Sequence, residues 1–157
     1  MNIEVYEINF SLDQPGYSAQ RILEKLQQRL TQAKTHTGGQ LFQIPHHVLL
    51  VDSHKDRVRY FGSLLSGAGY QYMVTATTVE AFTLILQGKC MPFALIIGQE
   101  DAKQRFFLNR LFHLFQVVGP PHLVWTLIIF VLNPTERSNH FLIIVIINEQ
   151  IMENTII

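Results

Sequence analysis

The chain has 157 residues, about the length of one domain, and its 12 Lys and Arg residues balance its 12 Asp and Glu residues. A formal net charge of zero argues against a dedicated nucleic-acid binder, and 48% hydrophobic against 15% charged residues argues against intrinsic disorder. The single cysteine, Cys90, excludes an intramolecular disulfide, and the first residues lack a signal-peptide pattern, so we expect a cytoplasmic protein.

Two apolar runs near the C-terminus raise the question of a membrane protein. They comprise residues 123–132 and 141–147, with a polar stretch between them. A membrane-spanning helix needs about 20 consecutive apolar residues, so both runs are too short. Their content of Ile and Val favours buried strands, and we expect no membrane contact.

The first 45 residues differ from the rest of the chain. Residues 3–10 alternate apolar and polar side chains, which predicts a strand, and a turn-forming Asp-Gln-Pro-Gly sequence follows. Residues 17–35 have the apolar spacing of an amphipathic helix, and Gly38 and Gly39 begin a linker. We expect residues 1–45 to form an N-terminal helical extension. Its apolar stripe either packs on the following domain or pairs with a second copy as a short coiled coil.

From residue 46 onward, strand and helix patterns alternate. The expected strands are residues 48–51, 70–76, 93–97, 122–129 and 141–147. The expected helices are residues 54–67, 79–87 and 101–118, followed by a short helical tail at 149–157. This alternation predicts an α/β fold with right-handed crossovers and a parallel sheet covered on both faces. The continuous apolar strands fit burial from both sides.

Several residues between 46 and 118 have the spacing of one known family. An apolar strand ends in Asp52, a Gly-Tyr pair opens the next strand, and an alanine precedes a Glu-Ala pair that starts the next helix. These last features are Gly69 and Tyr70, Ala76, and Glu80 and Ala81. The segment resembles the first half of response-regulator receiver domains. The resemblance implies that residues 46–157 form a doubly wound five-stranded parallel sheet of flavodoxin-like order 2-1-3-4-5, acting in a two-component pathway.

The departures from the receiver pattern concern its phosphorylation site. The first carboxylate of the acidic pair is present as Asp52, but the second position is Ser53. The phosphoacceptor position is Gly98, the hydroxyl position of the fourth strand is Thr126, and the lysine position falls near Asn148. Glycine cannot accept a phosphoryl group, and one carboxylate is a poor ligand set for Mg²⁺. We therefore expect no catalysis, no metal and no cofactor at this degenerate site.

Other interpretations of the same crevice stay open. Asp52 could be a strand-end residue that only caps a helix. Glu100 or Asp101 could serve as a displaced phosphoacceptor, although both suit the first turn of a helix. The stretch from Asp52 to His54 is similar to the Asp-x-His-x-x-Gly loop of cobalamin-binding domains, except that Arg57 replaces the glycine. That similarity implies a small-ligand or cofactor-binding domain as the alternative function.

The C-terminal third is unusual for a receiver. Residues 133–140 leave room for about one helical turn where the family has a full helix, and residues 141–147 are too apolar for an exposed edge strand. We expect a second copy or the N-terminal segment to cover this region, and predict a homodimer with the region at its interface. The predicted function is a phosphorylation-independent pseudo-receiver that acts through contacts with a kinase or output protein.

Overall fold

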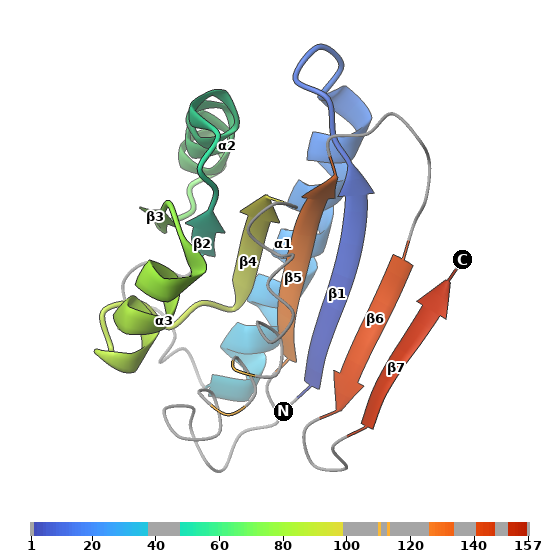
Figure 1. Cartoon of the computed structure of the whole chain (residues 1–157), viewed down its shortest axis with the longest axis vertical. Coiled ribbons are helices and arrows are strands. Elements are labelled where there is room, and N and C mark those ends of the chain that lie inside the picture. Colours follow the sequence, from blue (N-terminus) through green and yellow to red (C-terminus); the bar gives the residue numbers. More distant parts are fainter. Residues whose placement is uncertain are drawn as a thin grey trace.

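The computed structural model describes residues 2–37, 48–98, 110, 113, 126–133, 141–146 and 151–156. These residues form one sheet with helices on both faces (Figure 1). The strands are β1 (Asn2–Asn9), β2 (Val48–Val51), β3 (Tyr72–Thr75), β4 (Ala94–Gly98), β5 (Thr126–Asn133), β6 (Phe141–Ile146) and β7 (Ile151–Ile156). The helices are α1 (Gly16–Thr37), α2 (Lys55–Gly67) and α3 (Thr78–Leu86).

Five neighbouring strands of the sheet are parallel. The order across the sheet is β3-β2-β4-β5-β1-β6-β7, and every pair from β3 to β1 is parallel. The expected α/β class with a five-stranded parallel sheet is confirmed, and the arrangement is compatible with a flavodoxin-like fold. The expected strand order is wrong at its fifth position, because β1 pairs with β5 where residues 141–147 were expected.

The lengths of the connections explain this difference. A parallel neighbour needs a crossover of a dozen or more residues, and only residues 134–140 separate β5 from β6. β6 instead runs antiparallel to β1, and β7 follows as its antiparallel partner. The helical tail expected at residues 149–157 is also wrong, because pairing with β6 makes this segment a strand. A helix of that length has little stability of its own in water.

The N-terminal strand lies inside the sheet, between β5 and β6. Glu4 and Tyr6 point from one face of β1 toward α1. There Arg29 forms an ion pair with Glu4, and the Lys25 ammonium lies 5.2 Å from the centre of the Tyr6 ring. The buried side chains of Ile3 and Val5 point to the opposite face, as the two-residue period of a strand requires. Residues 2–9 thus share one sheet with the strands that follow residue 46.

The order of the strands determines which face each helix covers. The connections from β1 to β2 and from β2 to β3 advance in one direction across the sheet, whereas the connection from β3 to β4 runs back. Right-handed crossovers therefore place α1 and α2 on one face and α3 on the other. In agreement, the Tyr70 hydroxyl after α2 donates to Gln27 of α1 at 3.2 Å. In Figure 1, α1 lies behind β4, β5 and β1.

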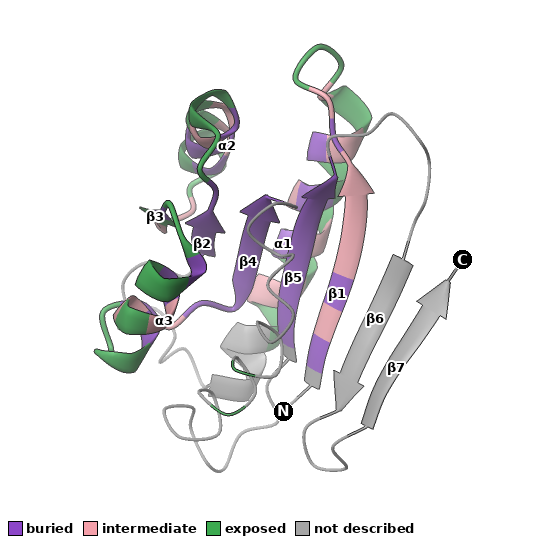
Figure 2. Ribbon diagram, viewed as in Figure 1, coloured by how far each residue is buried: buried purple, intermediate pink, exposed green. Residues whose placement is uncertain are grey.

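The core follows the central strands. Every residue of β2 and β4 and residues 127–133 of β5 are buried, which appears as the purple centre of Figure 2. β5 ends four residues later than the expected strand at 122–129, because it pairs along its length with β1 and β4.

The expected helix at 101–118 lies outside the described residues, apart from the helical Arg110 and His113. No helix within the described part of the chain is long and apolar enough to cross a membrane.

Candidate functional site

The carboxyl ends of β2 and β4 meet where the sheet changes its winding direction. Such a switch point is where open parallel α/β sheets bind their ligands. Asp52 follows β2 directly, and Gly98 is the last residue of β4. Val51 pairs with Ile97, so Asp52 and Gly98 lie next to each other across the two strands. Two of the expected site residues therefore come together at this position.

The Asp52 carboxylate is buried and bound by donors of the chain itself. Its side chain is 0% exposed. Arg57 Nε donates to Oδ2 at 2.8 Å and Arg57 Nη2 donates to Oδ1 at 2.9 Å. The backbone N–H of His54 also donates to Oδ1, at 2.8 Å. Both carboxylate oxygens are thus engaged, in the two-pronged geometry that makes arginine–carboxylate pairs strong and specific.

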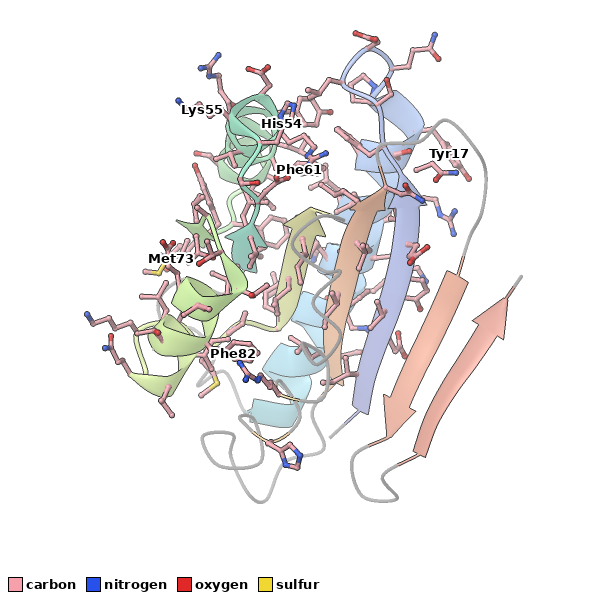
Figure 3. The ribbon with its side chains drawn as sticks, viewed as in Figure 1. Tyr17, His54, Lys55, Phe61, Met73 and Phe82 are labelled. Carbon is pink, nitrogen blue, oxygen red and sulfur yellow. The ribbon has the colours of Figure 1, made fainter. Side chains whose placement is uncertain are left out.

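The start of α2 positions Arg57 for this pair. His54 is the N-cap residue of α2, and its Nδ1 accepts a hydrogen bond from the backbone N–H of Arg57 at 3.3 Å. This cap places Arg57 in the first helical turn, where its side chain reaches back to Asp52 and is buried. Figure 3 shows His54 and Lys55 at this end of α2, with Phe61 on the side facing the sheet. In the cobalamin-like interpretation, Arg57 therefore fills the position where the loop needs a glycine.

The absence of a side chain at Gly98 makes room for the ion pair. A Cβ atom there would lie 2.9 Å from Arg57 Nη2, 2.9 Å from Asp52 Oδ1 and 3.1 Å from Asp52 Cγ. These separations are well below the optimum of about 3.5–4.0 Å for carbon contacts. Any residue with a side chain would displace the pair, so Gly98 and Arg57 depend on each other. The space in which the receiver pattern has an acidic acceptor is occupied here by a guanidinium group.

The pair also determines which charges this edge of the sheet can accept. Arg57 neutralises Asp52 in a buried place, where an unpaired charge of either sign is costly. A divalent cation binds through several oxygen ligands, and the one carboxylate at this point already has a cation and a backbone donor bound to it. Among the residues that the structure describes, no group of three or more His, Cys, Asp or Glu side chains is placed to hold a metal ion.

The other three expected site residues do not contribute to this ion pair. Ser53 is exposed beside Asp52. Thr126 is the first residue of β5 and pairs with Asn2, at the amino-terminal edge of the parallel strands. It lies about 23 Å along the strand from Asn133, taking about 3.3 Å per residue, and thus at the opposite edge from Asp52. Asn148 lies outside the described residues.

Sequence reasoning did not identify Arg57 as the partner of Asp52, nor two asparagines at the same sheet edge. Asn9 ends β1 and pairs in register with Asn133, which ends β5. The backbone N–H of Phe10 donates to the Asn133 carbonyl at 2.9 Å, which closes this edge. The position of Arg57 on the first turn of an expected helix was the only signal available for the ion pair. No sequence signal marked Asn9, because its place at this edge depends on the pairing of β1 within the sheet.

The only cysteine is not a nucleophile at neutral pH. Cys90 precedes β4 and is 0% exposed. Burial raises the pKa of its thiol to about 12, so the reactive thiolate does not form near pH 7. The described residues around it therefore offer no basis for thiol chemistry.

Comparison with known proteins adds no family assignment. No family model matches the chain, and no curated protein or solved structure matches it significantly. The resemblance to receiver domains consequently rests on the residue spacing between 46 and 118.

Proposed function

We propose that this chain is a phosphorylation-independent pseudo-receiver, a cytoplasmic signalling module that works through protein–protein contacts and catalyses no reaction. The observation that supports the proposal is the buried ion pair between Asp52 and Arg57, packed against Gly98. By the receiver resemblance, Asp52 and Gly98 stand where that family has a metal-binding carboxylate and the phosphoacceptor. With the guanidinium bound to Asp52 and packed against Gly98, this edge offers neither free carboxylate oxygens for a cation nor a side chain to phosphorylate.

A module of this kind can signal without phosphate. A partner that binds one conformation better than another shifts the population toward that conformation. The ion pair connects the first turn of α2 to the end of β2 and packs against Gly98 at the end of β4, so it stabilises one arrangement of this edge without any added ion. The proposed partners are a kinase or output protein of a two-component pathway and a second copy of the chain.

Treatment with phosphoryl donors tests the proposal. The protein is incubated with Mg²⁺ and either acetyl phosphate or beryllofluoride, next to an active receiver as the positive control. Intact mass and melting temperature are measured. We expect no phosphoryl adduct and no Mg²⁺-dependent rise in melting temperature. An adduct that maps to Asp52, Glu100 or Asp101 would overturn the proposal.

A variant pair tests the reason for the inactivity. The triple variant Ser53→Asp/Arg57→Ala/Gly98→Asp removes the guanidinium and gathers three carboxylates, whereas Ser53→Asp alone leaves the ion pair in place. If the pair is what excludes the cation, Mg²⁺ raises the melting temperature of the triple variant and not that of the single variant. Circular dichroism establishes that both are folded. A response of the single variant to Mg²⁺ would contradict the argument.

One observation favours the alternative of small-ligand binding at the same edge. Among the described side chains, the buried Asn9 Oδ1 at the carboxyl end of β1 has no hydrogen-bond partner, and neither does Thr75 Oγ1, four strands away at the end of β3. Buried polar atoms are nearly always paired, so such atoms can mark the place of a ligand or water. Native mass spectrometry of the purified protein tests this alternative. A retained small molecule, lost on Asn9→Leu, would support it over the pseudo-receiver.

A further inference from the structure

Glu7 is a half-buried acid of β1 whose side chain has no partner within the part of the chain that the structure describes. It follows Val5 by two positions, so it points to the face of the sheet opposite α1. The α1 cations Lys25 and Arg29 therefore lie across the sheet from it. Burial raises the pKa of the Glu7 carboxyl group and is the only cause of that shift. Removing a carboxylate from water without pairing it is costly, and such groups mark candidate binding sites.

Asn9, the next residue on this face of β1, also lacks a partner for its side-chain oxygen. It lies two positions from Glu7, about 7 Å along the strand. Its buried Oδ1 accepts no hydrogen bond. α1 lies behind β1 in Figure 1, so both side chains point toward the viewer, and the pink colour of this end of β1 in Figure 2 marks their partial exposure. Two described side chains at one end of β1 thus offer acceptors that no donor satisfies.

The backbone that carries these two side chains is held on several sides. β1 is paired with β5 on one side and with β6 on the other. The Ser18 hydroxyl donates to the Asn9 carbonyl at 2.9 Å, and the backbone N–H of Phe10 donates to the Asn133 carbonyl at 2.9 Å. A site on a paired strand is positioned more precisely than a site on a loop. The acceptors of Glu7 and Asn9 are therefore presented from a fixed backbone.

We propose that Glu7 and Asn9 bind the ammonium group of a small primary amine. An ammonium group has three N–H donors and a positive charge, which match a carboxylate and an amide oxygen that both need a donor. A divalent metal ion fits less well, because two side chains supply fewer oxygen ligands than the six or more that Ca²⁺ takes. Asn9 as a whole is half-buried, and a turn of its amide about the Cβ–Cγ bond, a soft torsion, brings Oδ1 to the surface beside Glu7.

This site is separate from the ion pair that supports the proposed function. β1 lies three strands from β2, roughly 14 Å across the sheet from Asp52, taking about 4.8 Å per strand. Contacts to one ammonium group give weak binding, because a ligand of few atoms gains little free energy. The amine is therefore a ligand that exchanges with solvent, unlike the retained molecule of the alternative function. It leaves the pair between Asp52 and Arg57 intact, so the inference does not depend on the pseudo-receiver proposal.

An NMR titration of the ¹⁵N-labelled full chain with propylamine at pH 7 tests the site, with propanol as the neutral control. We expect saturable shifts of the amide signals of residues 7–10 with the amine and none with the alcohol. Glu7→Gln keeps the shape and removes the charge, so it should weaken binding by about tenfold to a hundredfold. Asn9→Asp adds a second charge and should tighten binding. Glu24→Gln, the same change at an exposed acid of α1, should bind like the unaltered chain.

The melting temperature of the free protein gives a second measurement. Glu7→Gln removes an unpaired half-buried charge, so this variant should melt at or above the temperature of the unaltered chain. A lower melting temperature would give the carboxylate a structural partner and overturn the proposal. Equal binding by Glu7→Gln and Glu24→Gln, weaker binding by Asn9→Asp, or displacement of the amine by Ca²⁺ or Mg²⁺ would also overturn it. Failure of the proposed function would instead appear as a phosphoryl adduct, which these measurements keep separate.

Discussion

Replacing Gly98 with alanine tests the packing that underlies the whole functional argument. The new Cβ would lie 2.9 Å from Arg57 Nη2 and 2.9 Å from Asp52 Oδ1. The guanidinium is the end of a flexible side chain and can retreat. The short Asp52 side chain is held by donors from Arg57 and His54, so it cannot move without lengthening at least one of those hydrogen bonds. Alanine should therefore distort the ion pair without abolishing it.

The expected magnitude lies between two limits. Overpacking a buried site costs about 1–3 kcal/mol, and breaking a buried ion pair outright costs about 3–5 kcal/mol. Distortion belongs to the first range, so we expect Gly98→Ala to lower the free energy of unfolding by about 2 kcal/mol. For a chain of this length that corresponds to a melting temperature lower by about 4–8 °C.

Urea unfolding of two glycine variants measures this effect. Gly67→Ala is the matched control, because a Cβ at exposed Gly67 meets no atom within 4 Å and alanine in a helix gains up to about 1 kcal/mol over glycine. The cost of Gly98→Ala should also fall in an Arg57→Ala background, since coupled residues are not additive. The reasoning is refuted if Gly98→Ala is as stable as Gly67→Ala, or if its cost is the same in both backgrounds.

Three further predictions concern the ion pair, the helix cap and the cysteine. Asp52→Ala leaves the Arg57 cation buried without its carboxylate, and urea unfolding should show a loss of about 3–5 kcal/mol, much of which Asp52→Ala/Arg57→Ala regains. His54→Ala removes the N-cap of α2 and should lose about 1 kcal/mol, whereas His54→Asn, an equally good cap, should keep the original stability in thermal melts. The raised pKa of Cys90 means that the unfolded chain releases the thiol proton above about pH 9.0 while the folded chain keeps it to about 12. Stability should therefore fall with rising pH in that window, and urea unfolding at several pH values should show a steeper fall for the unaltered chain than for Cys90→Ala.

The central part of the fold could be predicted from local pattern. The strand at 48–51 was expected with the bounds of β2, and α2 begins one residue after its expected start, because His54 caps it. Short apolar runs bounded by turn residues specify buried strands without long-range information. The parallel pairing of the strands next to β2, joined by right-handed crossovers, followed from the alternation of these strands with amphipathic helices.

The sheet edges depended on information that local pattern does not contain. Residues 3–10 alternate like a strand, but their place beside β5 is decided by pairing with residues far along the chain. One constraint was available: the connection at residues 134–140 is too short for a parallel return. Applied strictly, it would have excluded residues 141–147 as the fifth parallel strand. The strand β7 could not be foreseen from its own composition, because its pairing with β6 determines it.

The candidate site was predictable only where it follows strand ends. Asp52 and Gly98 were found because each closes an apolar run. Thr126 was misplaced because the strand was expected at residues 122–129, whereas β5 begins at Thr126 and continues to Asn133. Arg57 was missed for a different reason: a charged residue on an amphipathic helix is usually exposed, and its burial depends on a carboxylate and a glycine from two separate strands.

The position of β1 bears on the proposed function. The order of the parallel strands differs from the expected flavodoxin-like order in its fifth place, which β1 from the N-terminus takes. The fifth-position strand then ends at Asn9 and is followed by Phe10. Asn148, near which the receiver pattern predicted a lysine, follows β6 in the sequence instead. Phe10 is buried and packs its ring 4.9 Å from that of Phe61 in α2. The acceptor position is glycine, the cation is an internal arginine, and the strand end at the lysine position carries an amide and an aromatic ring. These features agree with the proposed function, a pseudo-receiver that binds partner proteins and is not phosphorylated.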